Sequence, residues 1–271
     1  MINGEKITFQ YKSGTQILKD LDLRIEAGKL TAILGKNGSG KSTLVRLITA
    51  LLPMSDGELR VCGSAIRTEE GVKEVRRHCG IVFQNPDNQF VSPIVEEDIK
   101  FGLENHEVPE AEHESRIHDA LSAAGLTGFE KRIISTLSGG QKQLTAAAGI
   151  FALHNNILIF DEASSMLDPE GKAVLMECIK AQCESGKTVI LITQNIAEAA
   201  QADCILLMND GHIAASGSPR EVLTDLPLLE KAGIRPPLPV RVFYDLKRSG
   251  IELPFCPLTT EELAEEICSL N

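Results

Sequence analysis

Three continuous apolar runs set the pattern of this chain. They cover residues 30–34 (LTAIL), 157–160 (ILIF) and 188–193 (TVILIT), and none of them alternates apolar with polar positions. A strand with one wet face alternates with a period of two, whereas a strand covered on both faces reads as an unbroken apolar run. These segments therefore predict strands in the middle of a sheet that is covered on both faces.

A glycine-rich segment follows the first run. Residues 35–42 read GKNGSGKS and match the G-x-x-x-x-G-K-[ST] pattern of loops that bind nucleotide phosphates. From Lys41 onward, the residues up to 52 suit a buried helix, which Pro53 would stop. Strand, loop and helix in this order are the context that the pattern requires, so we predict a nucleoside triphosphate site here.

The chemistry of phosphate binding assigns contacts within this segment. Glycine lets the backbone wrap closely around phosphate oxygens, and the N-terminus of the following helix adds partial positive charge. Lys41 is expected to reach the β- and γ-phosphates, and the Ser42 hydroxyl to bind Mg²⁺. The predicted nucleotide contacts here are Gly35, Asn37, Gly38, Ser39, Gly40, Lys41, Ser42 and Thr43.

Two carboxylates follow the run at 157–160. Asp161 stands where the strand would end and is expected to hold Mg²⁺, directly or through water. Glu162 comes next and is expected to polarise the water that attacks the γ-phosphate. An acidic pair after a strand is also typical of a helix start, but the phosphate loop favours the catalytic interpretation.

The stretch from about residue 88 to 140 is mostly polar and predicts helices. Its segment 96–114 is rich in Asp and Glu. Such a segment is typical of a solvated helix face, and the alternative is a docking surface for a basic partner.

The C-terminal part is rich in proline. Seven of the twelve prolines lie within 219–257, which predicts a linker or a loop-rich appendage. Thr259 and Glu262 then have the spacing of a capping box that starts a short helix. Its apolar face would carry Leu263, Ile267 and Leu270.

Composition excludes several classes of protein. The 27 Lys and Arg against 38 Asp and Glu give a net charge of −11, which argues against a general nucleic-acid binder. No apolar run approaches the roughly 20 residues that cross a bilayer, and the first residues lack the features of a secretion signal. The seven cysteines show no C-x-x-C spacing, so buried, reduced thiols are expected and no zinc site is predicted.

The order of motifs resembles the ATP-binding cassette (ABC) family over roughly residues 5–220. The phosphate loop is followed by Gln84, then by LSGGQ at 137–141, then by Asp161 and Glu162 and by a loop at 165–168. In that family LSGGQ reaches across a dimer to the nucleotide bound by the partner. The nucleotide contacts implied by these two later motifs are Ser138, Gly139, Gly140, Gln141 and Asp168.

The resemblance also assigns roles near the nucleotide. Tyr11 would stack on adenine, although a packed surface aromatic is a serious alternative. Gln84 would sense Mg²⁺ and the γ-phosphate and so counts among both the catalytic and the metal-binding candidates. The implied cofactors are ATP and Mg²⁺.

The implied fold is α/β, a P-loop (RecA-like) ABC nucleotide-binding domain. It would contain an N-terminal β subdomain and a helical subdomain at about 88–143, both within residues 1–220. Residues 221–271 would form a small C-terminal extension and are a candidate dimerisation element.

Further segments point to a subgroup of this family. VFQNPDNQF at 82–90, VEEDIKFGLEN at 95–105 and GIELP at 250–254 look like the A component of energy-coupling factor (ECF) transporters, relatives of cobalt and nickel import ATPases. The likeness implies an ATPase that pairs with a second ATPase subunit, as a homo- or heterodimer. It would bind an integral membrane T component, at whose basic coupling helices the acidic segment would dock.

The same likeness implies a transport role. A small S component would select the substrate, a vitamin or a transition-metal ion, and the ATPase would lie peripherally on the cytoplasmic face of the membrane. The alternatives are the ATPase of a conventional ABC importer and a non-transport ABC ATPase. Non-transport members usually carry tandem cassettes or long coiled-coil inserts, neither of which this sequence shows.

Two positions depart from the family pattern. Gln194 stands where a histidine normally contacts the γ-phosphate, and Leu144-Thr145 replaces a common Arg-Val pair. Glutamine can donate and accept hydrogen bonds but carries no titratable proton near neutral pH. Gln194 therefore joins Glu162 and Gln84 as a catalytic candidate. Either its site turns over slowly within an unequal pair, or Glu162 suffices and glutamine replaces histidine adequately.

Overall fold

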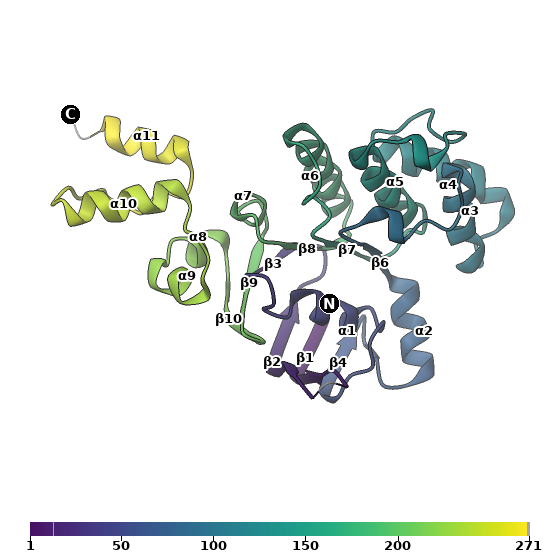
Figure 1. Ribbon diagram of the computed structural model, residues 1–271, viewed down its shortest axis with the longest axis horizontal. Helices are drawn as coiled ribbons and strands as arrows, with labels where there is room; N and C mark the ends of the chain where they lie inside the picture. The colour runs from purple at the N-terminus through teal and green to yellow at the C-terminus, as the bar shows by residue number, and fades with distance from the viewer. Residues whose placement is uncertain (13, 270–271) are drawn as a thin grey trace.

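The computed structural model describes residues 1–12 and 14–269 and contains two sheets flanked by helices (Figure 1). The larger sheet has six strands in the order β10-β9-β3-β8-β7-β6. Its strands pair in parallel except β10, which is antiparallel to β9. The bounds are Leu30–Leu34 (β3), Cys79–Val82 (β6), Ile157–Asp161 (β7), Thr188–Thr193 (β8), Cys204–Asn209 (β9) and His212–Gly217 (β10).

The three apolar runs form strands inside this sheet, as predicted. Every residue of β3, β7 and β8 is buried. Successive residues of β7 enter different cores: Ile157 and Ile159 pack into one hydrophobic cluster, and Leu158 and Phe160 into the other. Because both faces are covered, both sets of alternate positions are mainly apolar.

The first core, which contains Ile157 and Ile159, lies between the large sheet and a smaller N-terminal sheet, and α1 (Lys41–Ile48) contributes to it. The small sheet has the order β2-β1-β4-β5, all antiparallel, and α2 (Glu69–His78) follows it. Its strands are Ile2–Gln10 (β1), Gln16–Ile25 (β2), Asp56–Val61 (β4) and Ser64–Ala65 (β5).

Helix α1 ends earlier than the sequence predicted. We expected it to continue to residue 52, but its last residue is Ile48. Ala50 adopts a left-handed conformation with φ of +52°. The N–H groups of Leu51 and Leu52 both donate to the carbonyl of Arg46, at 2.8 and 3.0 Å, so the chain turns before it reaches Pro53.

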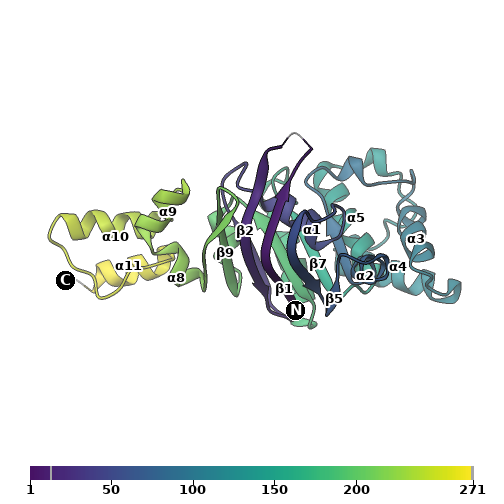
Figure 2. The same cartoon turned by 90° about the horizontal axis from the view of Figure 1, so that it is seen from below.

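The second core lies under the helices on the opposite face of the sheet, which confirms the helical character predicted for most of 88–140. Helices α3 and α4 lie at one end of the molecule in both side views (Figures 1 and 2). The helices of this group are Val95–Asn105 (α3), His113–Ala123 (α4), Gly139–Ala152 (α5), Pro169–Glu184 (α6) and Ile196–Ala199 (α7). Short 3₁₀ turns occupy Pro86–Asn88, Glu110–Glu112 and Ile134–Thr136.

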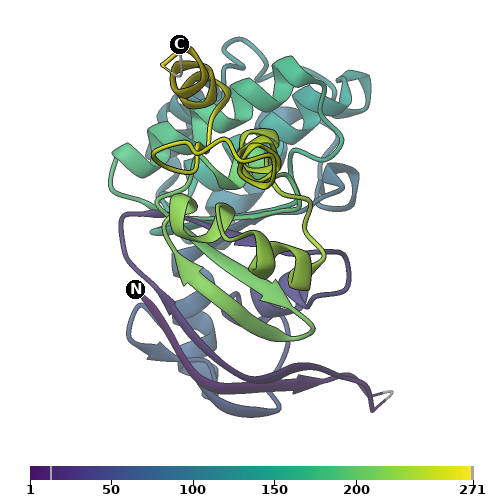
Figure 3. The same cartoon turned by 90° about the vertical axis from the view of Figure 1, so that its left-hand side faces the viewer.

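The C-terminal part forms helices at the other end of the molecule (Figure 2), the end that faces the viewer in Figure 3. They are Pro219–Leu223 (α8), Leu226–Ala232 (α9), Leu238–Arg248 (α10) and Thr260–Cys268 (α11). The prediction of a loop-rich appendage is therefore wrong. Helices α8, α9 and α10 each carry proline in their first turn. A proline there fits because the first helical N–H has no partner to lose.

Helix α11 begins with half of the predicted capping box. The Thr259 hydroxyl accepts the N–H of Glu262 at 3.2 Å. The Glu262 carboxylate instead accepts the N–H of Leu258 at 2.7 Å and pairs with Arg220. Leu263 is buried and Ile267 is 42% exposed, while Leu270 lies outside the described residues.

Within the part of the chain that the structure describes, no helix has both the length and the apolar character needed to cross a bilayer. All seven cysteines are free. The expectation of buried thiols holds for Cys178 but is wrong for Cys62 and Cys268, which are exposed.

Candidate functional site

The glycine-rich loop joins β3 to α1. The Ser39 N–H donates to the Lys36 carbonyl at 3.2 Å and closes the turn. Gly38 and Gly40 have φ of +80° and +103°, a region that side chains with a Cβ rarely adopt. A Cβ on Gly40 would also lie 2.9 Å from the Leu18 side chain. The loop therefore has the tight backbone that phosphate cradles require.

The Lys41 side chain folds back over this loop and is only 4% exposed. Its ammonium group donates to the carbonyls of Gly35 and Lys36 at 2.8 and 3.1 Å and lies 3.6 Å from Glu162 Oε1. Burial lowers the pKa of Lys41, and the Glu162 carboxylate opposes that shift. A buried ammonium group beside a glycine-rich backbone is suited to phosphate oxygens.

Ser42 and Asp161 meet from distant parts of the chain. The Ser42 hydroxyl donates to Asp161 Oδ1 at 3.0 Å, and both residues line a cavity of about 500 Å³ together with Gln84 and Arg46. Burial raises the pKa of Asp161, and the hydrogen bond from Ser42 opposes that shift. Hydroxyl, carboxylate and amide oxygens are the ligands that Mg²⁺ prefers, so these residues could hold that ion.

Glu162 is the meeting point of the predicted catalytic residues. Its carboxylate accepts the Gln194 amide at 3.0 Å and the Gln84 amide at 3.4 Å, beside Lys41. Its backbone is left-handed, with φ of +51°, and its N–H donates to the Ile192 carbonyl at 3.0 Å. The neutral Gln194 amide thus reaches the carboxylate directly.

Tyr11 lies beside the first turn of α1. Its hydroxyl is 3.3 Å from the Thr43 hydroxyl, and its ring meets Phe9 edge-on with centroids 4.9 Å apart. Stacking on adenine stays a prediction for this half-buried ring. Of the other loop residues, Asn37 is exposed, and the Ser39 hydroxyl is buried without a hydrogen-bond partner among the described residues.

The LSGGQ segment starts helix α5. Ser138 Oγ accepts the Gln141 N–H at 3.2 Å, and Gln141 Oε1 accepts the Ser138 N–H at 3.0 Å, which completes a capping box. Gly139 and Gly140 form the first turn, and nothing lies within 4 Å of a Cβ built on Gly139. In the described part of the chain, no hydrogen bond joins this segment to the phosphate loop. Its action on a partner's nucleotide stays a prediction.

Asp168 occupies a similar position at the next helix. Its carboxylate accepts the Gly171 N–H at 2.7 Å and caps α6. Among the described residues, no hydrogen bond joins Asp168 to the Glu162 cluster, and its role at the nucleotide stays a prediction.

Helix α5 also holds the segment that carries Gln84. The Gln143 amide, in a side chain 1% exposed, donates to the Phe83 carbonyl at 3.0 Å. Lys142 pairs with Asp87 at 2.7 Å. The LSGGQ helix and the Gln84 segment of one subunit are therefore directly connected, which the sequence did not reveal.

The departure at 144–145 faces the protein interior. Leu144 and Thr145 are both buried, and the Thr145 hydroxyl donates to the Gln141 carbonyl at 2.8 Å. An uncharged pair suits this environment because neither side chain reaches solvent.

Sequence reasoning missed Glu198 and Ser164, which hydrogen bond to each other behind the site. The available signal was a single carboxylate within the apolar segment IAEAA at 196–200. An isolated charge on an otherwise apolar helix often indicates a buried polar network.

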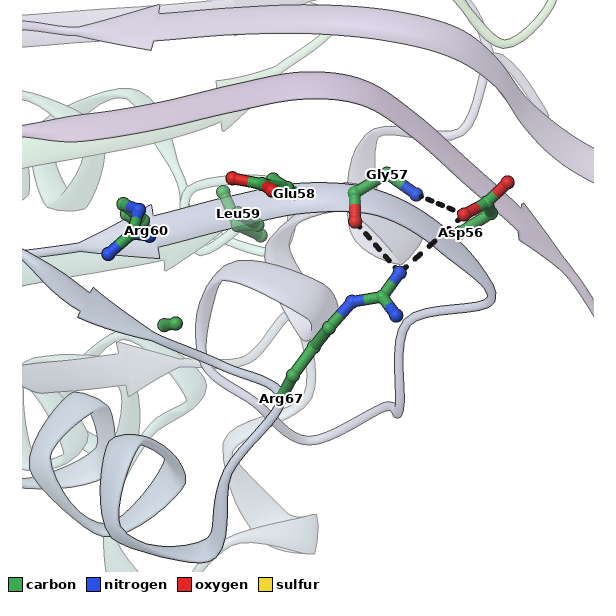
Figure 4. A pocket seen from close by; sticks show the side chains of 7 residues that line it. Asp56, Gly57, Glu58, Leu59, Arg60 and Arg67 are labelled. Carbon is green, nitrogen blue, oxygen red and sulfur yellow. Dashed lines mark hydrogen bonds and ion pairs between the residues drawn. The ribbon is translucent and has the colours of Figure 1, made fainter.

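A separate cavity of about 430 Å³ lies beside β4 and β5 (Figure 4). Its Arg67 side chain donates to the Gly57 carbonyl at 2.8 Å and lies 3.6 Å from Asp56. None of the predicted site residues lines this cavity, so it is separate from the predicted nucleotide site.

A phosphate loop after β3, a carboxylate pair after β7 and an LSGGQ helix together define an ATP-binding cassette. The profile of the family described as "ABC transporter" matches residues 18–165, and the chain belongs to this family. Members of the family bind and hydrolyse ATP in connection with transport, as the sequence predicted.

Relatives of similar length share its whole extent. The energy-coupling factor transporter ATP-binding protein EcfA1 of Enterococcus faecalis is 43% identical over 265 residues, covering 97% of this chain and 95% of the relative. The protein of the same name from Streptococcus pneumoniae is 41% identical and covers 100% and 98%.

Solved structures confirm the predicted fold class. CbiO1 of Clostridium perfringens, described as part of the ABC transporter complex cbiONQ, superposes with a TM-score of 0.77 at 32% identity, over 91% of this chain and 98% of that one. MJ0796, described as a bacterial ABC transporter cassette in a dimeric structure, gives a TM-score of 0.74 at 28% identity, over 81% and 99%.

Proposed function

We propose that this chain is the ATP-hydrolysing subunit of an ECF-type importer. The observation that carries the proposal is the convergence of Lys41, Gln84 and Gln194 on the Glu162 carboxylate, next to the Ser42–Asp161 pair. The names and full-length similarity of the EcfA1 relatives support the subgroup.

Each residue of the site has a task in phosphoryl transfer. Lys41 neutralises phosphate charge, and Glu162 orients and polarises the attacking water. Ser42, Asp161 and Gln84 would hold Mg²⁺, which when bound to ATP supplies charge neutralisation at the phosphates. The two glutamine amides fix the Glu162 carboxylate between them, so it faces the phosphate loop.

A complete site needs a second ATPase subunit. Ser138, Gly140 and Asp168 would serve the nucleotide held by the partner, so an isolated subunit should be nearly inactive. The dimeric structure of the MJ0796 cassette supports this arrangement. We assign residues 221–271 to a C-terminal extension that helps the dimer form.

The membrane partner would dock on the acidic helices. Glu96, Glu97, Glu110, Glu114 and Asp119 line a groove of about 1080 Å³ between α3 and α4, together with Lys100 and Lys131, which pair with Glu110 and Glu96. Carboxylates still outnumber lysines in this lining, and basic coupling helices of a T component would match that net negative charge. The ATPase would then lie on the cytoplasmic face of the membrane as a peripheral subunit, and an S component would select a vitamin or metal ion such as cobalt.

Two measurements test this proposal. Mg²⁺-dependent ATPase activity should rise faster than linearly with protein concentration if the chain forms its own dimer, and Glu162→Gln should abolish it. Co-expression with candidate membrane subunits should recover a T component in a stable complex. Recovery of a periplasmic binding protein system would instead indicate a conventional importer, and recovery of rRNA or DNA would indicate a non-transport ATPase.

Gln194 motivates a second proposal, that the site of this subunit is the slower one of an unequal pair. The Gln194 amide contacts Glu162 but cannot carry a proton charge as histidine can. Gln194→His should then raise ATP turnover of the assembled complex. If turnover does not rise, glutamine already replaces histidine adequately.

A further inference from the structure

A buried carboxylate lies directly behind the catalytic cluster. Glu198 is on the short helix α7 and is only 3% exposed. An ionised carboxylate this far from water is costly unless hydrogen bonds satisfy it. The hydrogen-bond donors around Glu198 therefore indicate which parts of the chain it connects.

Three donors satisfy both carboxylate oxygens. The Ser164 hydroxyl donates to Glu198 Oε1 at 2.7 Å, and the Asn195 amide donates to the same oxygen at 3.1 Å. The Thr193 hydroxyl donates to Oε2 at 2.6 Å. Ser164 and Thr193 are themselves 4% and 3% exposed, so this part of the network is buried, whereas Asn195 is an exposed residue at its edge.

The donors come from the two segments that carry the catalytic pair. Ser164 lies two positions after Glu162, while Thr193 and Asn195 stand on either side of Gln194. The Asn195 N–H also donates to Thr193 Oγ1 at 2.9 Å, which bends the backbone around Gln194. The Glu198 carboxylate thus links the chain segment that carries Glu162 to the segment that carries Gln194.

We propose that Glu198 is a positioning residue for ATP hydrolysis, which keeps Gln194 within hydrogen-bond distance of Glu162. This inference rests on the proposed function above. A glutamine side chain has more rotatable bonds than the histidine usual at this position. Its reach to Glu162 at 3.0 Å therefore depends on a fixed backbone. Glu198 touches neither Lys41 nor the phosphate loop by any hydrogen bond among the described residues, so ATP binding should not depend on it.

The test compares kcat and KM for ATP in the assembled, full-length complex. Glu198→Ala should lower kcat at least tenfold, while KM and the affinity for a non-hydrolysable ATP analogue change less than twofold. Glu198→Gln keeps the volume and one acceptor oxygen and should lose less. Gln201→Ala, at an exposed glutamine just beyond α7, is the matched control and should leave kcat unchanged.

A second variant covers the case in which Glu198→Ala fails to fold. Ser164→Ala removes one donor, leaves the carboxylate bound by two, and should lower kcat about threefold or more without changing KM. In a double-mutant cycle, Glu198→Gln should cost less in a Gln194→Ala background than in the wild type, because the two act through one contact.

The inference is overturned if folded Glu198 variants keep kcat within twofold of the wild type, or if KM rises in parallel with the loss of kcat. It is also overturned if the losses of kcat from Glu198→Gln and Gln194→Ala simply multiply in the double variant. Its failure can be distinguished from failure of the proposed function. If Glu162→Gln abolishes turnover but the Glu198 variants do not lower it, only the positioning role is wrong. If Glu162→Gln leaves turnover intact, the proposed function itself is wrong.

Discussion

The connection between α5 and the Gln84 segment gives a measurable prediction at Gln143. Its amide donates to the Phe83 carbonyl at 3.0 Å, and its side chain is only 1% exposed. Gln143→Met preserves most of the volume and removes the donor. The substitution therefore opens no large cavity, and the change in the free energy of unfolding reports the lost hydrogen bond.

The expected cost follows from burial. Leaving a buried polar group without its partner costs about 1–3 kcal/mol, so we expect the free energy of unfolding to fall by roughly 2 kcal/mol. For a chain of this size that corresponds to a decrease in Tm on the order of 4–8 °C. Urea and thermal unfolding, followed by circular dichroism, measure both quantities.

Gln201 provides the matched control. Its amide also donates to a backbone carbonyl at 3.0 Å, that of Ala197, but the residue is exposed. Water can replace that donor, so Gln201→Met should change the free energy of unfolding by less than about 0.5 kcal/mol. Equal effects of the two substitutions would refute the argument that burial of Gln143 makes its hydrogen bond important.

Three further predictions concern the site and the C-terminal helices. Lys41→Met should weaken ATP binding at least about tenfold by calorimetry, because a charge-assisted contact is lost; unchanged affinity would contradict the assigned role. Gln194→Ala should lower kcat about tenfold, the equivalent of roughly 1.4 kcal/mol for one hydrogen bond to Glu162, and equal kcat would argue against that contact. Hydrogen bonding from the Leu258 N–H, with Arg220 assisting, lowers the pKa of Glu262. Its stabilisation is therefore complete above the ordinary carboxyl pKa and is lost as pH falls through the lowered one, so unfolding of wild type and Glu262→Gln should converge in acid.

The sequence was most informative where short-range patterns decide the structure. The unbroken apolar runs predicted buried strands, and the glycine-lysine-serine pattern predicted the loop between β3 and α1. The meeting of Ser42 with Asp161 also follows, because parallel strands bring their carboxyl ends to one edge of a sheet.

The remaining features depend on contacts that no local pattern encodes. Gln143 reaches a carbonyl 60 positions away, and Glu198 accepts from a hydroxyl 34 positions away. Proline is ambiguous in sequence because it both breaks helices and begins them. The early end of α1 depends on one left-handed residue, Ala50, which is not a residue type that favours that conformation.

At Glu162, a strained left-handed backbone and the proposed catalytic carboxylate belong to the same residue. A non-glycine residue with φ of +51° costs on the order of 1 kcal/mol, and a glycine or asparagine would relieve it. Glu162→Gly would relieve this strain but would also remove the carboxylate that accepts the Gln84 and Gln194 amides. A substitution that stabilises the subunit at this position would therefore remove the proposed catalytic group.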